Sequence, residues 1–215
     1  MSPAARIHVV RHGETPGNAA RILQVPETPL SARGLRQAEA LASRFAAQAP
    51  ERIVASDLLR ARMTAEAVGA ACGVGVESEP LLRERDFGSL RGTPYAELDC
   101  DPFAPGYTPP GGESWPVFDA RVDAAWRHVQ EIADGCGGGD LLVVTHGLVC
   151  HALANRHWHG GADVLAGASA SAAGPRFANT CVTTLAGGAP WQVEVLACTA
   201  HLEGEARASG DVAPV

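Results

Sequence analysis

Short apolar runs alternate along the chain with longer segments in which apolar residues recur every three or four positions. The runs at Ile7–Val10, Arg52–Ser56 and 141–145 have the length and composition of strands that are covered on both faces. A further pair, 180–185 and 191–197, brackets the turn sequence AGGAP and predicts a closing hairpin. The chain is therefore expected to build a sheet from these runs.

Helical periodicity occupies the segments between the runs. Ser31 is a suitable N-cap for a helix, whose apolar face we assign to Leu35, Ala38, Leu41 and Phe45. Further helices are expected at 58–73, 118–132 and 148–157. Strands that alternate with helices predict the α/β class, here a three-layer α/β/α sandwich with a mainly parallel central sheet.

Three segments lack a regular pattern. Residues 77–115 are rich in Pro and Gly, residues 165–175 are of low complexity, and residues 204–215 have the composition of a loose tail. A chain of 215 residues suits one domain with one substantial core. We therefore expect a single domain at 1–203, followed by a flexible tail.

Composition and charge narrow the class of protein. The net charge of −7 predicts no bulk attraction to nucleic acid or to an anionic membrane. No apolar stretch approaches the roughly 20 residues of a spanning helix, and the first apolar run is too short for a signal peptide. The six cysteines include no C-x-x-C pair, as expected for thiols in a reducing compartment. The sequence predicts a cytoplasmic protein.

Two of the predicted strands run directly into a histidine. Arg11 and His12 follow the first run, and Thr145 and His146 follow a later one. Because ligands of α/β proteins bind beyond the carboxyl ends of parallel strands, both histidines should face one crevice. With Arg60, near a predicted helix start, they form a cluster of cationic donors. A phosphoryl group fits such a cluster, since guanidinium groups bind its oxygens in pairs of hydrogen bonds and a neutral imidazole can attack phosphorus.

Further motifs appear in a set order along the chain. They are RHGET with Asn18, PLSARGLRQAEALA, SDLLRARMTAE, LRERDFG, PGGES and VVTHG. An Arg-His-Gly triplet alone arises by chance, but the ordered set, which spans Ile7 to Leu185, is specific. On these motifs the chain resembles the histidine phosphatase superfamily, in its phosphoglycerate-mutase-like branch, and the resemblance implies that branch's fold.

The resemblance also implies a catalytic site. His12 would be the nucleophile that forms a phosphohistidine, and Glu84 would protonate the leaving alcohol and then activate water. The implied substrate-binding residues are Arg11, Asn18, Gln24, Arg60, His146 and Gly147, of which Arg11, Arg60 and His146 also belong to the catalytic set. Phosphoryl transfer needs charge stabilisation on the oxygens and an acid whose pKa is raised by burial, which agrees with these roles. Arginines and a histidine take the place of a metal, so no metal and no cofactor is expected.

Some candidates have competing neighbours. Arg62 lies two positions from Arg60, and positions two apart do not share a helix face; the motif favours Arg60. Glu79 and Asp86 compete with Glu84 as the acid, and the motif favours Glu84.

Two other groups receive structural interpretations. Thr15 is expected to cap a turn. The segment CHALANRHWH contains Cys150, His151, His157 and His159, but their spacing matches no standard zinc site, so we expect no metal there.

The sequence identifies the substrate less closely than it identifies the type of reaction. Val25, Glu27 and Arg91 depart from the commonest family pattern, at positions that border the expected phosphate pocket. Between Arg91 and Trp115 only Arg91 is basic, and the apolar members include Tyr95, Phe103, Tyr107 and Trp115. This favours a phosphomonoesterase with an aromatic mouth over a mutase dependent on 2,3-bisphosphoglycerate, which would need more basic residues for a second phosphate.

A catalytically weak phosphoester-binding module is the third alternative, and the intact set of catalytic residues argues against it. The expected partner is a small phosphorylated metabolite, with neither nucleic acid nor membrane. Whether the chain is a monomer or a homodimer stays open, as does whether the low-complexity loop borders the mouth or a dimer contact.

Overall fold

A mixed sheet forms the middle layer of the computed structural model, which describes residues 6–160 and 175–203. The strands in this described part are β1 (Arg6–Arg11), β2 (Arg52–Ala55), β3 (Val76–Ser78), β4 (Leu141–Thr145), β5 (Val182–Ala186) and β6 (Gln192–Cys198). Their spatial order is β3-β2-β4-β1-β5-β6. Strands β1 to β4 are mutually parallel, whereas β5 runs antiparallel to both β1 and β6. The mainly parallel sheet and the closing hairpin are confirmed.

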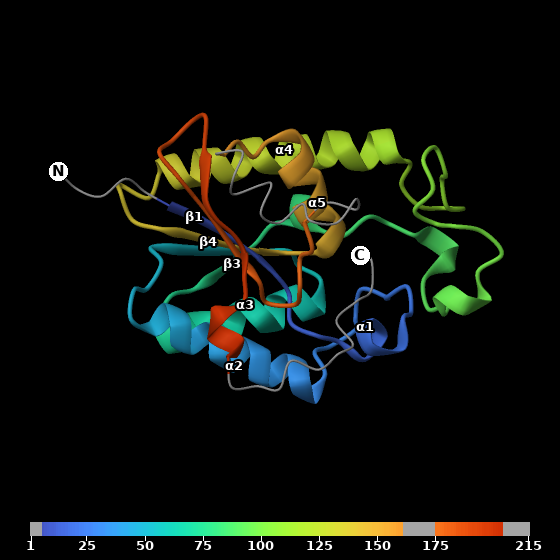
Figure 1. Cartoon of the computed structure of the whole chain (residues 1–215), viewed down its shortest axis with the longest axis horizontal. Coiled ribbons are helices and arrows are strands. Elements are labelled where there is room, and N and C mark those ends of the chain that lie inside the picture. Colours follow the sequence, from blue (N-terminus) through green and yellow to red (C-terminus); the bar gives the residue numbers. More distant parts are fainter. Residues whose placement is uncertain (1–5, 161–174, 204–215) are drawn as a thin grey trace.

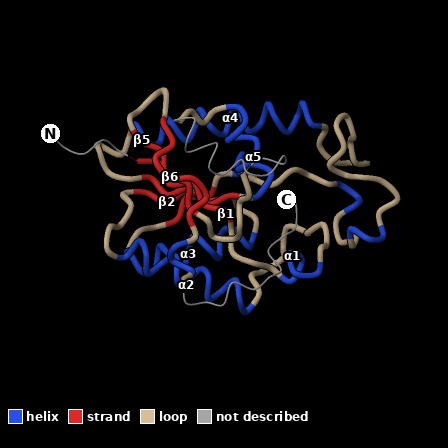
Figure 2. The backbone as a smooth tube through the Cα atoms, in the orientation of Figure 1, coloured by secondary structure: helices blue, strands red, loops and turns tan. Residues whose placement is uncertain are grey.

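Helices cover both faces of this sheet, which confirms the three-layer sandwich (Figures 1 and 2). They are α1 (Pro16–Ala20), α2 (Ala32–Ala46), α3 (Leu59–Cys72), α4 (Trp115–Asp134) and α5 (Gly147–Arg156). The apolar cores lie between the layers: Val9 of β1 packs on the side of α4 and α5, and its neighbour Val10 packs on the side of α2 and α3. Because successive strand residues point to opposite faces, a strand covered twice must be apolar throughout.

Helix α2 begins as predicted, and three of the four residues assigned to its buried face, Ala38, Leu41 and Phe45, are buried. The Ser31 side chain accepts a hydrogen bond from Gly34 N at 3.0 Å and caps the helix. Leu35, assigned to the buried face, is 45% exposed, so that assignment was wrong. A Cβ at Gly34 would lie 2.0 Å from the carbonyl oxygen of Glu14, and buried Gln37 accepts a hydrogen bond from Glu14 N at 2.8 Å. The helix therefore contacts the loop after β1 through Gly34 and Gln37, which leaves Leu35 outside.

Two short elements were missed by the periodicity. Helix α1 has five residues, too few for a repeat, and β3 is a three-residue edge strand paired only with β2. The irregular segment 77–115 otherwise contains single-turn 3-10 helices, at Pro80–Leu82, Gly88–Leu90 and Tyr95–Glu97.

Some expectations fall outside the described residues. These are the tail at 204–215 and the low-complexity loop at 165–175, apart from Pro175. In the parts of the chain that are described, no helix is long and apolar enough to cross a membrane.

Candidate active site

The carboxyl ends of three neighbouring parallel strands bring the candidate residues together. Arg11, the last residue of β1, lies opposite Thr145, the last residue of β4, and His12 N donates to Thr145 O at 2.9 Å. On the other side of β4, Ser56 N donates to Val144 O at 3.0 Å. His12, His146 and Ser56 therefore follow adjacent strands, as the strand-end pattern predicts for the two histidines.

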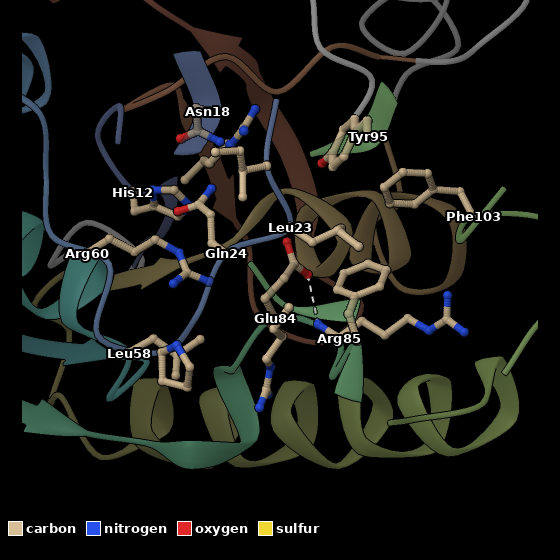
Figure 3. A pocket seen from close by; sticks show the side chains of 15 residues that line it. His12, Asn18, Leu23, Gln24, Leu58, Arg60, Glu84, Arg85, Tyr95 and Phe103 are labelled. Carbon is tan, nitrogen blue, oxygen red and sulfur yellow. Dashed lines mark hydrogen bonds between the residues drawn. The ribbon is translucent and has the colours of Figure 1, made fainter. Parts of the chain in front are cut away.

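A pocket of about 540 Å³, counting its space open to solvent, lies at this edge of the sheet (Figure 3). Six of the residues predicted for the site line it: Arg11, His12, Asn18, Gln24, Arg60 and Glu84. Of the other two, His146 is buried beside His12, with ring centroids 5.1 Å apart, and Gly147 is the first residue of α5. Neither is among the described residues that line the pocket. Six of the eight predicted residues thus line one pocket, whereas His146, which was expected to face it with His12, is buried beside His12.

His12 is held as a neutral ring with one nitrogen available. Its Nδ1 lies 2.7 Å from the carbonyl oxygen of Gly13, which can only accept, so Nδ1 carries the proton and Nε2 keeps its lone pair. Burial, and then the charges of Arg60 and Arg11, hold the pKa of His12 well below its usual 6.5. Such a ring can act as a nucleophile at neutral pH.

The two arginines at the pocket keep unsatisfied donors. Arg11 donates from NH1 to Phe177 O at 2.6 Å, and Arg60 donates from NH1 to Val25 O at 3.2 Å, but both Nε–H groups are buried without a partner. Burial is the main cause that lowers the pKa of Arg60, to about 10, so its guanidinium stays charged at neutral pH. Buried unpaired donors are rare, and an anion bound in the pocket would be a suitable acceptor for them.

Glu84 faces the same pocket from the loop before α4. Its two carboxyl oxygens accept hydrogen bonds from Arg85 N at 3.0 Å and from Leu148 N at 3.1 Å. Burial raises its pKa, against the opposing effects of these bonds and of Arg60 and Arg11. A carboxyl group with a raised pKa is suited to donate a proton and then take one back.

An ion pair behind Glu84 fixes the loop that carries it. Arg121 of α4 donates to Leu81 O at 2.8 Å and to Arg83 O at 2.7 Å, and its guanidinium binds both carboxyl oxygens of Glu113, from the PGGES motif, at 2.8 and 2.7 Å. The PGGES motif therefore acts on the site through the loop that carries Glu84.

Asn18 and Gln24 are oriented by Thr15, which was expected to cap a turn and caps the short helix α1. Asn18 Oδ1 accepts hydrogen bonds from Thr15 N at 3.2 Å and from Asn179 Nδ2 at 3.3 Å, and Gln24 Oε1 accepts one from Thr15 Oγ1 at 2.8 Å. Because their oxygens are engaged, the two amides present their NH2 groups as the remaining donors of the pocket wall (Figure 3).

The opposite wall is aromatic. Phe103 meets Phe87 and Tyr95 edge to face, at 5.6 and 5.7 Å between ring centroids, and all three line the pocket. Arg91 also lines it and pairs with Asp86 at 2.9 Å. The aromatic mouth is thus present, but the predicted Tyr107 and Trp115 have another position. They surround Arg85, which donates to Tyr107 O at 2.6 Å and lies 3.9 Å from the Trp115 ring.

The structure distinguishes Arg60 from its neighbour Arg62, and it gives the histidines of the segment CHALANRHWH separate contacts. Arg62 is exposed and pairs with Glu66 at 3.4 Å, whereas Arg60 is 3% exposed. His157 pairs with Asp123 at 2.7 Å, and the His151 ring packs on Phe177 at 4.9 Å. No cluster of three metal-ligating side chains occurs among the described residues.

Several residues of the site were missed from the sequence, among them Phe87, Ser56 and Arg121. Phe87 and Ser56 stand inside motifs that were quoted only for their charged members, and Arg121 has no local signal because it acts across a long sequence separation. A polar residue directly after a buried strand was the signal available for Ser56, as it was for His12.

Comparisons with known proteins agree on a family. The model described as "Histidine phosphatase superfamily (branch 1)" matches residues 7–186. A curated relative, "Probable phosphoglycerate mutase GpmB" of Yersinia pestis (strain Pestoides F), is 34% identical over 158 residues, which are 69% of this chain and 72% of the relative.

Solved structures also match. A mycobacterial glucosyl-3-phosphoglycerate phosphatase in complex with VO3 has a TM-score of 0.71 and 28% identity, over 89% of this chain and 98% of its own. YhfR of Bacillus stearothermophilus has a TM-score of 0.76 and 27% identity, over 93% of this chain and 100% of its own.

Proposed function

The chain belongs to the histidine phosphatase superfamily, branch 1, and we propose that it is a phosphomonoesterase for a small phosphorylated metabolite, with His12 as the nucleophile. The geometry of His12 carries the proposal. Its Nε2 is uncharged and unprotonated, and it stands beside two guanidinium groups whose buried Nε–H groups lack a partner. These are the requirements of attack on a phosphoryl group: a neutral nucleophile and preorganised positive charge for the oxygens.

The reaction then takes two steps. His12 Nε2 forms a bond to phosphorus while the ester P–O bond breaks, and Glu84 gives its proton to the leaving alcohol oxygen. In the second step, Glu84 takes a proton from water, the water oxygen bonds to phosphorus, and the N–P bond breaks to release phosphate. Arg11 and Arg60 stabilise the charge on the phosphoryl oxygens in both steps, with the amides of Asn18 and Gln24 as further donors.

A mutase is the second candidate, because a relative carries that name. The mouth favours hydrolysis. Arg91 is paired with Asp86, and the guanidinium of Arg85 is already bound to the carbonyl oxygens of Pro102 and Tyr107. Arg91 and Arg85, which line the pocket on the side of the mouth, are therefore already engaged with other groups before a second phosphate could bind.

Phosphate release tests the proposal. The assay compares p-nitrophenyl phosphate, glycerol 3-phosphate, 3-phosphoglycerate, sugar phosphates, nucleoside monophosphates and ribazole phosphate, in the presence of a chelator and without a bisphosphoglycerate primer. His12→Ala is the test variant, and His128→Ala, at an exposed histidine of α4, is the matched control. We expect release by wild type and His128→Ala, and none by His12→Ala.

The phosphoenzyme provides a second measurement. Rapid quenching of wild type should trap an acid-labile, base-stable phosphoprotein that His12→Ala lacks. Isomerisation of 3-phosphoglycerate only with primer would identify a mutase instead, and tight phosphoester binding without turnover would identify a binding module.

A further inference from the structure

Ser56 has no assigned role, yet it contacts the histidine pair. It follows β2 directly and is completely buried, and its hydroxyl oxygen lies 2.8 Å from His146 Nε2. Leu58 N donates to the same oxygen at 3.3 Å. The other ring nitrogen of His146, Nδ1, is buried and has no partner.

The hydrogen bonds of Ser56 define how the His146 ring is protonated. A hydroxyl has one proton to donate, and because Leu58 N–H already donates to this oxygen, the remaining neighbour for the proton is His146 Nε2. The ring is neutral, since burial holds the pKa of His146 well below its usual value, so it carries one proton. With Ser56 donating to Nε2, that proton resides on Nδ1, and one buried donor lacks a partner. The opposite arrangement leaves two groups unmatched, the hydroxyl proton and the Nδ1 lone pair.

We propose that Ser56 is a positioning residue that fixes His146 as the Nδ1-protonated tautomer and thereby makes its Nδ1–H a donor to the bound phosphoryl group. This inference rests on the proposed function, because the phosphoryl group supplies the acceptor that Nδ1–H lacks. Six buried side-chain nitrogen and oxygen atoms among the described residues have no partner. Three of these atoms, on Arg11, Arg60 and His146, then share one anion.

The neighbours of His12 and His146 thus give the two rings complementary protonation. The carbonyl of Gly13 keeps a lone pair on His12 Nε2 for attack, and the hydroxyl of Ser56 keeps a proton on His146 Nδ1 for binding. The rings are 5.1 Å apart. With the tautomers of His146 reversed, a lone pair would face the anion and repel it.

Nitrogen NMR of the histidine rings tests the tautomer directly. In wild type, long-range ¹H–¹⁵N spectra should show His146 protonated on Nδ1 and unprotonated on Nε2. Ser56→Ala should lose this preference and bind orthophosphate about twofold more weakly or worse, because only the fraction of His146 rings that is protonated on Nδ1 can donate to the anion. Thr183→Val is the matched control: Thr183 is equally buried and accepts a backbone hydrogen bond, from Ala197 N at 3.1 Å, but it contacts no histidine of the pair. It should change neither measurement.

Two results would overturn the inference: a wild-type His146 protonated on Nε2, or a folded Ser56→Ala protein with unchanged ring shifts and unchanged orthophosphate affinity. If Ser56→Ala does not fold, the wild-type spectrum still decides the tautomer, and Ser56→Cys, a weaker donor of similar volume, should give an intermediate affinity. Wild type that has the Nδ1–H tautomer and binds orthophosphate but hydrolyses no ester would contradict the proposed function and support this inference.

Discussion

The two ends of the pocket are built in different ways. The strand-end cluster, formed by Arg11, His12, Arg60 and His146, is at most 7% exposed at each residue, and every ring or guanidinium has a fixed partner. The mouth, formed by Phe87, Arg91, Tyr95 and Phe103, comes from a segment without strands or long helices and is held by edge-to-face ring contacts and one ion pair.

The difference separates reaction from specificity. Groups that stabilise charge in a reaction must be preorganised, and strand ends in the middle of a buried sheet provide that rigidity. Groups that select a leaving alcohol need only offer a shape and a surface, which irregular segments can supply. Changes in the cluster should therefore affect all substrates strongly, and changes in the mouth should affect some substrates weakly.

Among the variants that keep the nucleophile, Arg60→Ala should show the largest effect. Loss of one buried guanidinium from the phosphoryl site should lower kcat/KM by roughly 10³-fold for every ester. Arg62→Ala, two positions along the same helix but exposed and paired with Glu66, should stay within about twofold of wild type, as surface ion pairs contribute little. Similar losses in both variants would show that the cluster is not the reacting end.

Glu84→Gln should divide the substrates by leaving group. An alkyl phosphate needs its leaving oxygen protonated, so its rate should fall by about 10²-fold or more, while p-nitrophenyl phosphate, whose leaving group is stable as an anion, should change little in its first step. Glu79→Gln, in the same loop, is the control and should have no such pattern. Equal slowing of both ester types by Glu84→Gln would remove Glu84 as the acid.

The residues at the strand ends and those of the mouth also differ in how far the sequence could predict them. Arg11, His12 and His146 were predictable because each follows an apolar run at once, and parallel strands end at one edge. Leu35 was misassigned because the centre of the helix contact is a glycine and a glutamine, which carry no hydrophobic signal. Helix α1 was missed because its five residues are held by the Thr15–Asn18 capping box and not by a periodic face.

The mouth was only partly predictable for a related reason. Its aromatic character can be read from the composition of the segment 91–115, but which rings face the pocket depends on Arg85. That guanidinium binds the carbonyl oxygens of Pro102 and Tyr107 and stacks on Trp115. Trp115 therefore lies against Arg85, away from the mouth, whereas Phe103 lies at the mouth. These are tertiary contacts with no local pattern.

The pH dependence of the hydrolysis rate should show the ionisation of both the Glu84 carboxyl group and the His12 ring. In the proposed mechanism His12 reacts as a neutral ring, and its pKa is lowered, so the rate for an alkyl phosphate should rise with pH along a limb that lies below 6.5. Glu84 is protonated in the first step of that mechanism, and its pKa is raised, so the rate should fall along a limb that lies above 4.5. Glu84→Gln should abolish the upper limb and keep the lower one. An upper limb that persists in this variant would assign it to another group.

Phe103→Ala should give the smallest effect and the most selective one. The ring lies on the pocket wall against Phe87 and Tyr95, so its loss removes apolar surface that an aromatic leaving group would contact. KM for p-nitrophenyl or naphthyl phosphate should rise by about three- to tenfold, with kcat nearly unchanged, while glycerol 3-phosphate should be insensitive. Tyr107→Ala, from the same segment but not among the described residues that line the pocket, is the control. If Phe103→Ala instead lowered kcat for all esters alike, the mouth would take part in the reaction together with the strand-end cluster, and the separation of reaction from specificity would fail.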